Sequence, residues 1–225
     1  MTEPDTIVLA EPDIIIVGAG GHGRVLIDVL RRCGLTVAAA VDINRALHGH
    51  AVDGVPVISG DDAVFARNPK SVRLVSGHGN IPGKGASGLA GRRGMYERFT
   101  ARGYHFMSVV SADAVVSTAA VLKDGCQIIT GAIVHPGCVI GVDAIVNTGA
   151  RVDHDCVIGP HSHIAPGAVL CGGVILGAEC HVGAGAVVIP QIKIGAGAVI
   201  GAGAVLTTDV AAGATMLGIP ARHVR

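Results

Sequence analysis

The sequence of 225 residues predicts two domains of different classes, an α/β domain over residues 1–107 and an all-β parallel β-helix over residues 108–225. Two observations predict this organisation. A strand, a glycine-rich turn and a helix follow one another from Asp13, which is typical of an α/β fold. Aliphatic residues then recur at every sixth position from Val110 to Leu206, and so short a repeat indicates a β-helix.

The composition separates the two domains and excludes several classes of function. The two tyrosines and three phenylalanines all precede residue 107 and tryptophan is absent, so the second domain needs a core of Val, Ile, Leu and Ala. Lys plus Arg and Asp plus Glu balance at 17 each, so we expect no basic surface for nucleic acid or an anionic membrane. No uninterrupted apolar stretch of about 18 residues occurs that could span a membrane.

The N-terminal segment and the cysteines indicate the compartment. The segment MTEPDTIVLAEPD lacks the basic region and long apolar run of a signal peptide. None of the six cysteines belongs to a CxxC pair. We therefore expect a cytoplasmic chain with reduced cysteines.

The first domain begins with a strand, Asp13–Val17, that reads as buried. A glycine-rich turn follows, then an amphipathic helix, Arg24–Cys33, and a second strand, Thr36–Val41. The turn fits the pattern G-x-G-x-x-G, and Asp42 directly follows the second strand. The glycines of this pattern are Gly18, Gly20 and Gly23. Such glycines let backbone N–H groups approach a phosphate, and an acidic residue at the end of the second strand can bind a ribose hydroxyl.

This glycine turn has three interpretations. An NAD site is the first, but the roughly 107 residues before the repeat are too few for a two-half dinucleotide fold. A nucleotide other than NAD fits the shorter domain, and this is our prediction. The third interpretation is a tight turn that binds nothing. Further strands are expected at 55–58, 72–76 and 104–107, with a helix at 92–102 and a loop that contains Gly83, Gly85, Gly88 and Gly91.

The repeat of the second domain has a large and a small position. Every sixth residue is Val, Ile or Leu over 17 consecutive positions. These residues are Val110, Val116, Leu122, Ile128, Val134, Ile140, Val146, Val152, Ile158, Ile164, Leu170, Leu176, Val182, Val188, Ile194, Ile200 and Leu206. The position four residues later is Ala, Cys or Ser in 14 of the 17 repeats. Three hexapeptides then form one triangular coil, and each coil stacks on the next.

Two further expectations follow from this pattern. Four cysteines occupy the small position, so we interpret them as packing residues rather than ligands or nucleophiles: Cys126, Cys138, Cys156 and Cys180. Six glycines at the turns are expected to supply positive φ angles: Gly141, Gly159, Gly177, Gly183, Gly195 and Gly201.

The repeats and the closing segment Met216–Ala221 resemble those of the hexapeptide-repeat acyltransferases. Together with the turn Gly18–Gly23, they resemble more narrowly the sialic-acid O-acetyltransferase and nucleotide-4-aminosugar N-acetyltransferase group, over the whole chain. The resemblance implies a Rossmann-like first domain that holds a nucleotide-linked sugar and a left-handed β-helix that holds acetyl-CoA. It also implies a homotrimer with active sites between the subunits.

The resemblance also assigns binding residues. Those expected at the nucleotide sugar are Gly18, Gly20, His22, Asp42, Asn44, Gly79 and Arg93. The first three would lie near the diphosphate, the next two near the base and ribose, and the last two where the pocket closes. Those expected at acetyl-CoA are His163, Gly172, Gly201 and Pro220.

His154 is the predicted general base. It lies in a run of an acidic residue, His, an acidic residue and Cys that resembles the catalytic segment of the family, which gives Asp155 the role of orienting the imidazole. Gly172 stands one full coil later and is expected to lie beside His154, where its N–H could face a thioester oxygen. The alternative is a solvated turn histidine. His163 and His181 are also one coil apart, and could form a surface ladder instead of a binding site.

The predicted function is acetyl-CoA-dependent N-acetylation of the 4-amino group of a nucleotide-linked 4-amino-4,6-dideoxysugar, a precursor of cell-surface glycans. Two alternatives stay open: an O-acetyltransferase for a sialic-acid-type sugar, and a non-catalytic nucleotide-binding scaffold. No metal, NAD or other redox cofactor is expected. The nucleotide base and the stereochemistry of the sugar are left open by the sequence.

Overall fold

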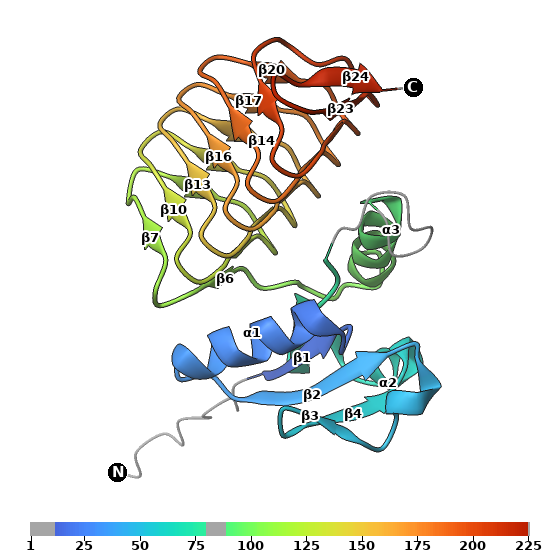
Figure 1. Cartoon of the computed structure of the whole chain (residues 1–225). Coiled ribbons are helices and arrows are strands. Elements are labelled where there is room, and N and C mark those ends of the chain that lie inside the picture. Colours follow the sequence, from blue (N-terminus) through green and yellow to red (C-terminus); the bar gives the residue numbers. More distant parts are fainter. Residues whose placement is uncertain (1–11, 80–88, 225) are drawn as a thin grey trace, which may run out of the picture.

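The structure is a computed structural model that describes residues 12–79 and 89–224. The N-terminal segment and the predicted loop glycines Gly83, Gly85 and Gly88 lie outside these residues. The described chain forms an α/β unit followed by a left-handed parallel β-helix, as the sequence predicts (Figure 1).

The α/β unit contains one five-stranded sheet of order β3-β4-β2-β1-β5, parallel except for β3. Its strands are β1 (Asp13–Val17), β2 (Val37–Asp42), β3 (Ala51–Val52), β4 (Val55–Ser59) and β5 (Val72–Ser76). Its helices are α1 (Gly21–Arg32), α2 (Asp61–Phe65) and α3 (Leu89–Thr100), with 3-10 turns η1 (Arg45–Leu47) and η2 (Pro69–Ser71). The predicted strand at 104–107 is wrong, because only Phe106 pairs there, in a single bridge to Leu74.

Both faces of β1 are buried, which explains its apolar run. Ile14 and Ile16 pack with α1, whereas Ile15 and Val17 face a second cluster. All five aromatic residues of the chain gather in or against this second cluster, on the sheet face away from α1. The aromatic residues therefore build the core of the α/β unit, and Tyr96 also contacts His161 of the β-helix with ring centroids 5.4 Å apart.

The β-helix is built of three sheets whose strands pair in parallel one coil apart, as β10 does with β13, except for the last strand, β24, which is antiparallel. The sheet facing the α/β unit, called here the covered face, contains β6 (Val109–Val110), β9 (Gln127–Ile128), β12 (Ile145–Val146), β15 (His163–Ile164), β18 (His181–Val182), β21 (Val199–Ile200), β23 (Thr215–Leu217) and β24 (Arg222–Val224). One open face contains β7 (Val115–Val116), β10 (Ile133–Val134), β13 (Arg151–Val152), β16 (Val169–Leu170), β19 (Val187–Val188) and β22 (Val205–Leu206). The other contains β8 (Val121–Leu122), β11 (Val139–Ile140), β14 (Val157–Ile158), β17 (Ile175–Leu176) and β20 (Lys193–Ile194).

The interior of the β-helix follows the predicted pattern. The aliphatic column from Ile128 to Leu206 is buried, and the small column between its members is buried with it. The four cysteines of that column are free thiols in this core, as expected for packing residues. Burial raises the pKa of each, to about 12 for Cys156, so none of them is an activated nucleophile.

The six turn glycines were predicted to supply positive φ angles, and this prediction was wrong. Gly141, Gly159, Gly177, Gly183, Gly195 and Gly201 do not have positive φ angles. At the first five, the backbone of the next coil lies too close for a Cβ, whereas at Gly201 the Leu217 side chain occupies that space. A Cβ on Gly177, for example, would stand 2.6 Å from the backbone nitrogen of Ala196.

Positive φ angles occur instead in a second column, at every sixth residue from 125 to 203. Nine of these positions are Gly125, Gly131, Gly137, Gly149, Gly167, Gly173, Gly185, Gly197 and Gly203. The other five are Asp143, Asp155, His161, Glu179 and Gln191. A left-handed residue other than glycine carries a conformational cost, so these five positions point to interactions that offset it.

Helix α1 lies between the sheet and the covered face of the β-helix (Figure 1). Its apolar side, which includes Leu26 and Leu30, shares one buried cluster with Val109, Ile129 and Ile145 of the β-helix. Because this contact is apolar and continuous with the core of the α/β unit, the two parts are held in one arrangement.

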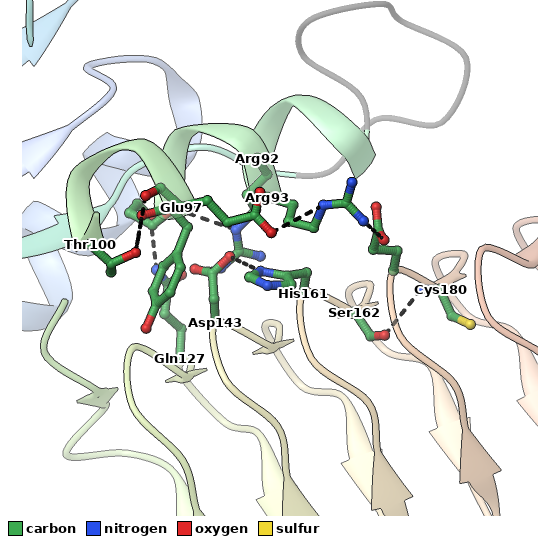
Figure 2. Close-up of polar contacts among 12 residues, drawn as sticks. Arg92, Arg93, Glu97, Thr100, Gln127, Asp143, His161, Ser162 and Cys180 are labelled. Carbon is green, nitrogen blue, oxygen red and sulfur yellow. Dashed lines mark hydrogen bonds and ion pairs between the residues drawn. The ribbon is translucent and has the colours of Figure 1, made fainter. Parts of the chain in front are cut away.

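Helix α3 adds a polar contact at one corner of the β-helix (Figure 2). The Arg92 guanidinium donates to Asp143 Oδ1 at 2.7 Å with both side chains fully buried, and His161 Nδ1 lies 3.0 Å from Asp143 Oδ2. Arg93 pairs with Glu179 in the next coil. Removing one partner of a buried ion pair costs about 3–5 kcal/mol, so this corner fixes where α3 lies.

The two glycine columns predict two different mutational responses. Gly177→Ala forces backbone against backbone and is expected to lower the free energy of unfolding by about 2 kcal/mol or more. Gly185 has φ +65°, but no atom lies within 4 Å of a Cβ built there. Gly185→Asn is therefore expected to lower the free energy of unfolding by only about 1 kcal/mol. Chemical denaturation of both variants measures the difference, and equal losses would contradict the assignment of the columns.

Candidate active site

A cavity of about 540 Å³ lies between the α/β unit and the β-helix. Its α/β wall comes from the carboxyl ends of β1, β2 and β5, and its other wall from one corner of the β-helix. The lining residues are Gly18, Gly20, Gly21, His22, Val25, Asp42, Gly77, His78, Gly79, Asn147, Thr148, His163 and Pro166. In sheets of this type the strand order reverses beside β1, and ligands bind at such switch points.

The glycine turn of this cavity is as tight as the motif predicts. Gly18 has φ +107°, and a Cβ on either Gly23 or Gly77 would stand about 2.2 Å or less from the Gly18 carbonyl oxygen. Gly20 caps α1 without a side-chain hydrogen bond. Gly20, Gly21 and His22 line the cavity, so the N-terminus of α1, whose first N–H groups have no partner within the helix, lies against it and suits a phosphate.

Asp42 shapes the far end of the cavity. One carboxylate oxygen accepts the N–H of Ala19 and the other accepts the N–H of Asn44, each at 2.8 Å. The Asn44 side chain caps η1 by accepting the N–H of Ala46, and Asn44 does not line the cavity. Asp42 still has free lone pairs for a ligand, whereas contact of Asn44 with a ligand stays a prediction.

His22 is held at the opposite end, against the β-helix. Its Nε2 lies 2.7 Å from Oε1 of Gln127, a fully buried residue of β9. Burial lowers the pKa of His22 to about 4. The predicted site residue Gly79 lies beside it, since a Cβ there would stand 3.8 Å from His22 Cβ.

The β-helix wall of the cavity contains an oriented histidine. Asn147 Oδ1 accepts the N–H of Thr148, so its amide nitrogen faces His163 Nε2 at 3.0 Å. His163 Nε2 is therefore the acceptor of that bond. The ring packs edge-on against His181 with centroids 5.1 Å apart, and burial lowers the pKa of His181 to about 4.

A second cavity, of about 440 Å³, lies at another corner of the β-helix. It is lined by Asp153, His154, Asp155, Cys171, Gly172, Gly173, Pro190 and Gln191. His154 Nδ1 lies 2.9 Å from Asp155 Oδ2, and this hydrogen bond, with the charge of Asp153, raises the pKa of His154. Asp155 is one of the left-handed residues, with φ 58°.

Gly172 lies beside His154 as coil arithmetic predicts. A Cβ on Gly172 would stand 2.5 Å from His154 Nε2, so no other residue type fits there without displacing the ring. Among the described residues, no hydrogen bond uses the Gly172 N–H. The corner thus presents an imidazole nitrogen next to a backbone donor that is free to bind a ligand.

The remaining predicted site residues lie elsewhere. Arg93 does not line either cavity, and its guanidinium contacts Glu97 and Glu179 (Figure 2). Gly201 lies under Leu217 of the C-terminal tail, and Pro220 lies in the same tail between β23 and β24. Roles of these three residues in binding stay predictions.

The two cavities share no lining residue, and the architecture explains why. The first lies along an edge of the covered face, whereas His154 lies at the corner where the two open faces meet. Within one chain, the glycine turn and the predicted base His154 therefore lie in different cavities.

Sequence reasoning gave no role to several residues of these sites. His78 and Asn147 line the first cavity, Gln127 holds His22, and Asp143 with His161 holds α3. A signal for the last two was present, because both replace glycine in the left-handed column. Gln127 is a polar residue at a repeat position that is Val or Ile throughout the rest of the first two coils, which was a weaker signal of a specific contact.

Two further observations concern metals and membranes. Across residues 12–79 and 89–224, no three His, Cys, Asp or Glu side chains are grouped so that they could hold a metal ion. In the same part of the chain, no helix has both the length and the apolar character needed to cross a membrane.

Comparison with protein families matches both parts of the chain. The PglD N-terminal domain matches residues 13–82. The bacterial transferase hexapeptide family, a model of six repeats, matches residues 155–189 and 173–208. A search of curated proteins finds no match.

Solved structures match the chain over nearly its whole length. A histidine-to-asparagine mutant of perosamine N-acetyltransferase from Caulobacter crescentus, in complex with CoA and GDP-perosamine, is 35% identical with a TM-score of 0.87, over 96% of this chain and 99% of that one. The acetyltransferase domain of PglB from Neisseria gonorrhoeae FA1090, in complex with acetyl coenzyme A, is 32% identical with a TM-score of 0.86, over 96% and 100%. WeeI from Acinetobacter baumannii AYE is 27% identical with a TM-score of 0.76, over 94% and 99%.

The α/β unit, the hexapeptide coils and the order in which they follow one another are thus common to this chain and to the first two of these structures, both acetyltransferases. The chain belongs to the hexapeptide-repeat acetyltransferase family whose members carry a PglD N-terminal domain.

Proposed function

We propose that this chain is an acetyl-CoA-dependent N-acetyltransferase that acts on the 4-amino group of a nucleotide-linked 4-amino-4,6-dideoxysugar. The observation that carries the proposal is the pairing of His154 with Asp155 beside the free N–H of Gly172. The glycine-turn cavity supplies a separate place for a diphosphate. The solved relative that contains both CoA and GDP-perosamine supports this substrate class.

The geometry around His154 supports its role as general base. Asp155 accepts a hydrogen bond from the Nδ1–H of His154, which leaves the Nε2 lone pair directed toward Gly172. As the sugar amine attacks the thioester carbonyl, Nε2 takes a proton from the amine, and Asp155 stabilises the imidazolium. The Gly172 N–H donates to the oxyanion of the tetrahedral intermediate. The intermediate then collapses, the C–S bond breaks, and the His154 imidazolium gives its proton to the sulfur, so that CoA leaves as the thiol and the base is regenerated.

The separation of the two cavities supports a homotrimer with active sites between subunits. In one chain the glycine turn and His154 are on different sides of the β-helix, so a second copy has to bring its His154 corner to the first cavity. Both open faces beside that corner expose large apolar side chains, namely Val115, Val121, Val157 and Ile175. Such patches on a protein surface mark association sites. A substrate pair of nucleotide sugar and acetyl-CoA is also consistent with the predicted cytoplasmic location.

The direct test of the function is a panel of UDP-, GDP- and dTDP-linked 4-amino sugars incubated with acetyl-CoA. Release of free thiol with one nucleotide sugar, and an acetamido product by mass spectrometry, are expected. Acetylation of a hydroxyl on a free sialic-acid-type sugar, with no nucleotide sugar accepted, would contradict the proposal.

Replacing the base is expected to remove catalysis without removing binding. His154→Asn should lower kcat by about 10² or more, because it abolishes proton uptake while keeping a polar side chain of similar reach. The KM values should change far less. His105→Asn, at an exposed histidine of the α/β unit, is the control and should keep normal turnover.

Asp155→Asn is expected to move the pH dependence in a defined direction. A base works only when unprotonated, so kcat/KM falls as the pH drops through the pKa of His154 in the free enzyme. Asp155 raises that pKa, so its removal should shift this acidic limb to lower pH. The maximum rate should fall as well, since the imidazole loses its orientation. An acidic limb that does not move would show that Asp155 does not set the pKa of His154.

The oligomer is tested by mass in solution. Light scattering should give three times the mass of one chain, 22.5 kDa. Val157→Glu and Val115→Glu place a charge on one open face each, and at least one of them should release monomers and abolish activity. A monomeric unmodified chain with full activity would overturn the intersubunit site.

A further inference from the structure

The hydrogen bonds around Gln127 determine which proton His22 carries. Gln127 Nε2 donates to the carbonyl oxygen of Ser76 at 2.7 Å. A carbonyl oxygen only accepts, so the amide nitrogen of Gln127 has to face Ser76 and its oxygen has to face His22. That oxygen lies 2.7 Å from His22 Nε2, which therefore donates. In the neutral ring the proton is on Nε2 and the lone pair is on Nδ1.

The surroundings of His22 keep the ring neutral. Burial is the main cause of its low pKa of about 4. The hydrogen bond to Gln127 comes next in size and favours protonation, as Asp143 does, whereas the positive charge of Arg92 and the neighbouring His78 oppose it. At neutral pH His22 is therefore not a cation. A neutral His22 cannot neutralise the charge of a diphosphate. If it lies near the diphosphate, as the resemblance implies, it acts there only through hydrogen bonds.

The free nitrogen of His22 belongs to the cavity. His22 lines the 540 Å³ cavity between the glycine turn and the β-helix wall, and no described residue bonds its Nδ1. A neutral lone pair there matches an O–H or N–H donor and repels a phosphate oxygen. Gln127, which bonds His22, pairs with Ile145 in the covered face, and Ile145 pairs with His163, so His22 lies on the β-helix side of the cavity, two strands from His163.

We propose that Gln127 is a positioning residue that fixes His22 as an acceptor at Nδ1, and that this nitrogen binds a hydroxyl or amino donor on the sugar part of the nucleotide sugar. The inference rests on the proposed function and adds to it a specificity contact. A residue of the β-helix thus sets the chemistry of a side chain in the α/β unit.

The packing around Gln127 leaves it one orientation. It is fully buried at the contact between the two parts of the chain. The carbonyl oxygen of Ser76 accepts the Gln127 amide, and the hydroxyl oxygen of Ser76 lies 3.4 Å from Arg92 Nε. Arg92 in turn is held by Asp143 (Figure 2). Turning the amide over would put oxygen against oxygen at Ser76.

The first test needs no substrate. Nitrogen NMR of the imidazole groups in the full chain should find His22 protonated at Nε2 only. Its ring should stay neutral down to about pH 5, one unit above its pKa of about 4. A proton on Nδ1, or titration near an ordinary value of about 6.5, would overturn the assignment.

The second test changes the partner of His22. In Gln127→Glu one carboxylate oxygen accepts from Nε2–H and stabilises the imidazolium, so the His22 pKa should rise, and Nδ1 should gain a proton as the pH is lowered through that raised pKa. The other carboxylate oxygen faces the Ser76 carbonyl oxygen without a proton to donate, so the melting temperature of the variant is measured alongside to show that it folds. As the pH is lowered from about 8 to about 6, the KM of this variant for the nucleotide sugar should therefore rise about tenfold. Its kcat should stay within about twofold of that of the unmodified chain. Gln127→Met removes both bonds without burying a charge, and should raise the same KM about tenfold at every pH.

The control variant is Asp113→Asn, which breaks the exposed contact of Arg32 with Asp113 between the same helix α1 and the first coil. It should leave KM and its pH dependence unchanged. If Gln127→Glu raises the His22 pKa but leaves KM constant, Nδ1 does not bind the sugar and the proposal is wrong. Failure of the proposed function would instead appear as no acetylated product from the unmodified chain, and the NMR result would still decide the role of Gln127.

Discussion

The close stacking of each coil on the next determines most other features of the β-helix. Parallel strands stand about 4.8 Å apart, and each residue lies beside its counterpart in the next coil. That spacing excludes a Cβ at Gly159 and Gly177, where the next backbone already fills the space. It also brings Gly172 to His154 and His163 to His181. The arrangement of the candidate site is therefore a by-product of the same regularity that closes the core.

Departures from regularity occur where the chain has a contact to make. The left-handed column is glycine at nine of its 14 positions, and Gln191, one of the other five, lines the second cavity. Its charged members each contact another side chain: Asp143 contacts Arg92, Asp155 contacts His154, and Glu179 contacts Arg93. The backbone cost of about 1–3 kcal/mol per residue at these positions is offset by the ion pairs and hydrogen bonds that they form. Backbone strain and side-chain interaction therefore coincide at two of the three corners of the β-helix, since Asp143 and Glu179 lie at one corner and Asp155 at another.

The sequence predicted the fold because its strongest signals are local and periodic. The aliphatic column and the strands β1, β2, β4 and β5 follow from neighbouring residues alone, and so does the stacking of Gly172 on His154. Periodicity did not separate the two kinds of turn glycine, because φ and coil contact are properties of the folded backbone. The bonds of His22 to Gln127 and of Arg92 to Asp143 join residues 105 and 51 positions apart. They depend on how the two parts pack, for which one sequence carries no pattern. Arg93 illustrates the same limit, since its partner Glu179 lies 86 positions away.

The C-terminal tail ends the stack in a different geometry from the one that builds it. β23 adds in parallel to β21, but β24 turns back and pairs with β23 antiparallel, and Met216 and Ala221 cover the last layer of the core. An open stack of parallel coils would offer its terminal backbone to any strand of another chain. The short outermost strand β24 instead presents Arg222 and His223 on an exposed edge, which disfavours such pairing. The tail thus protects a naturally extendable architecture against end-to-end polymerisation.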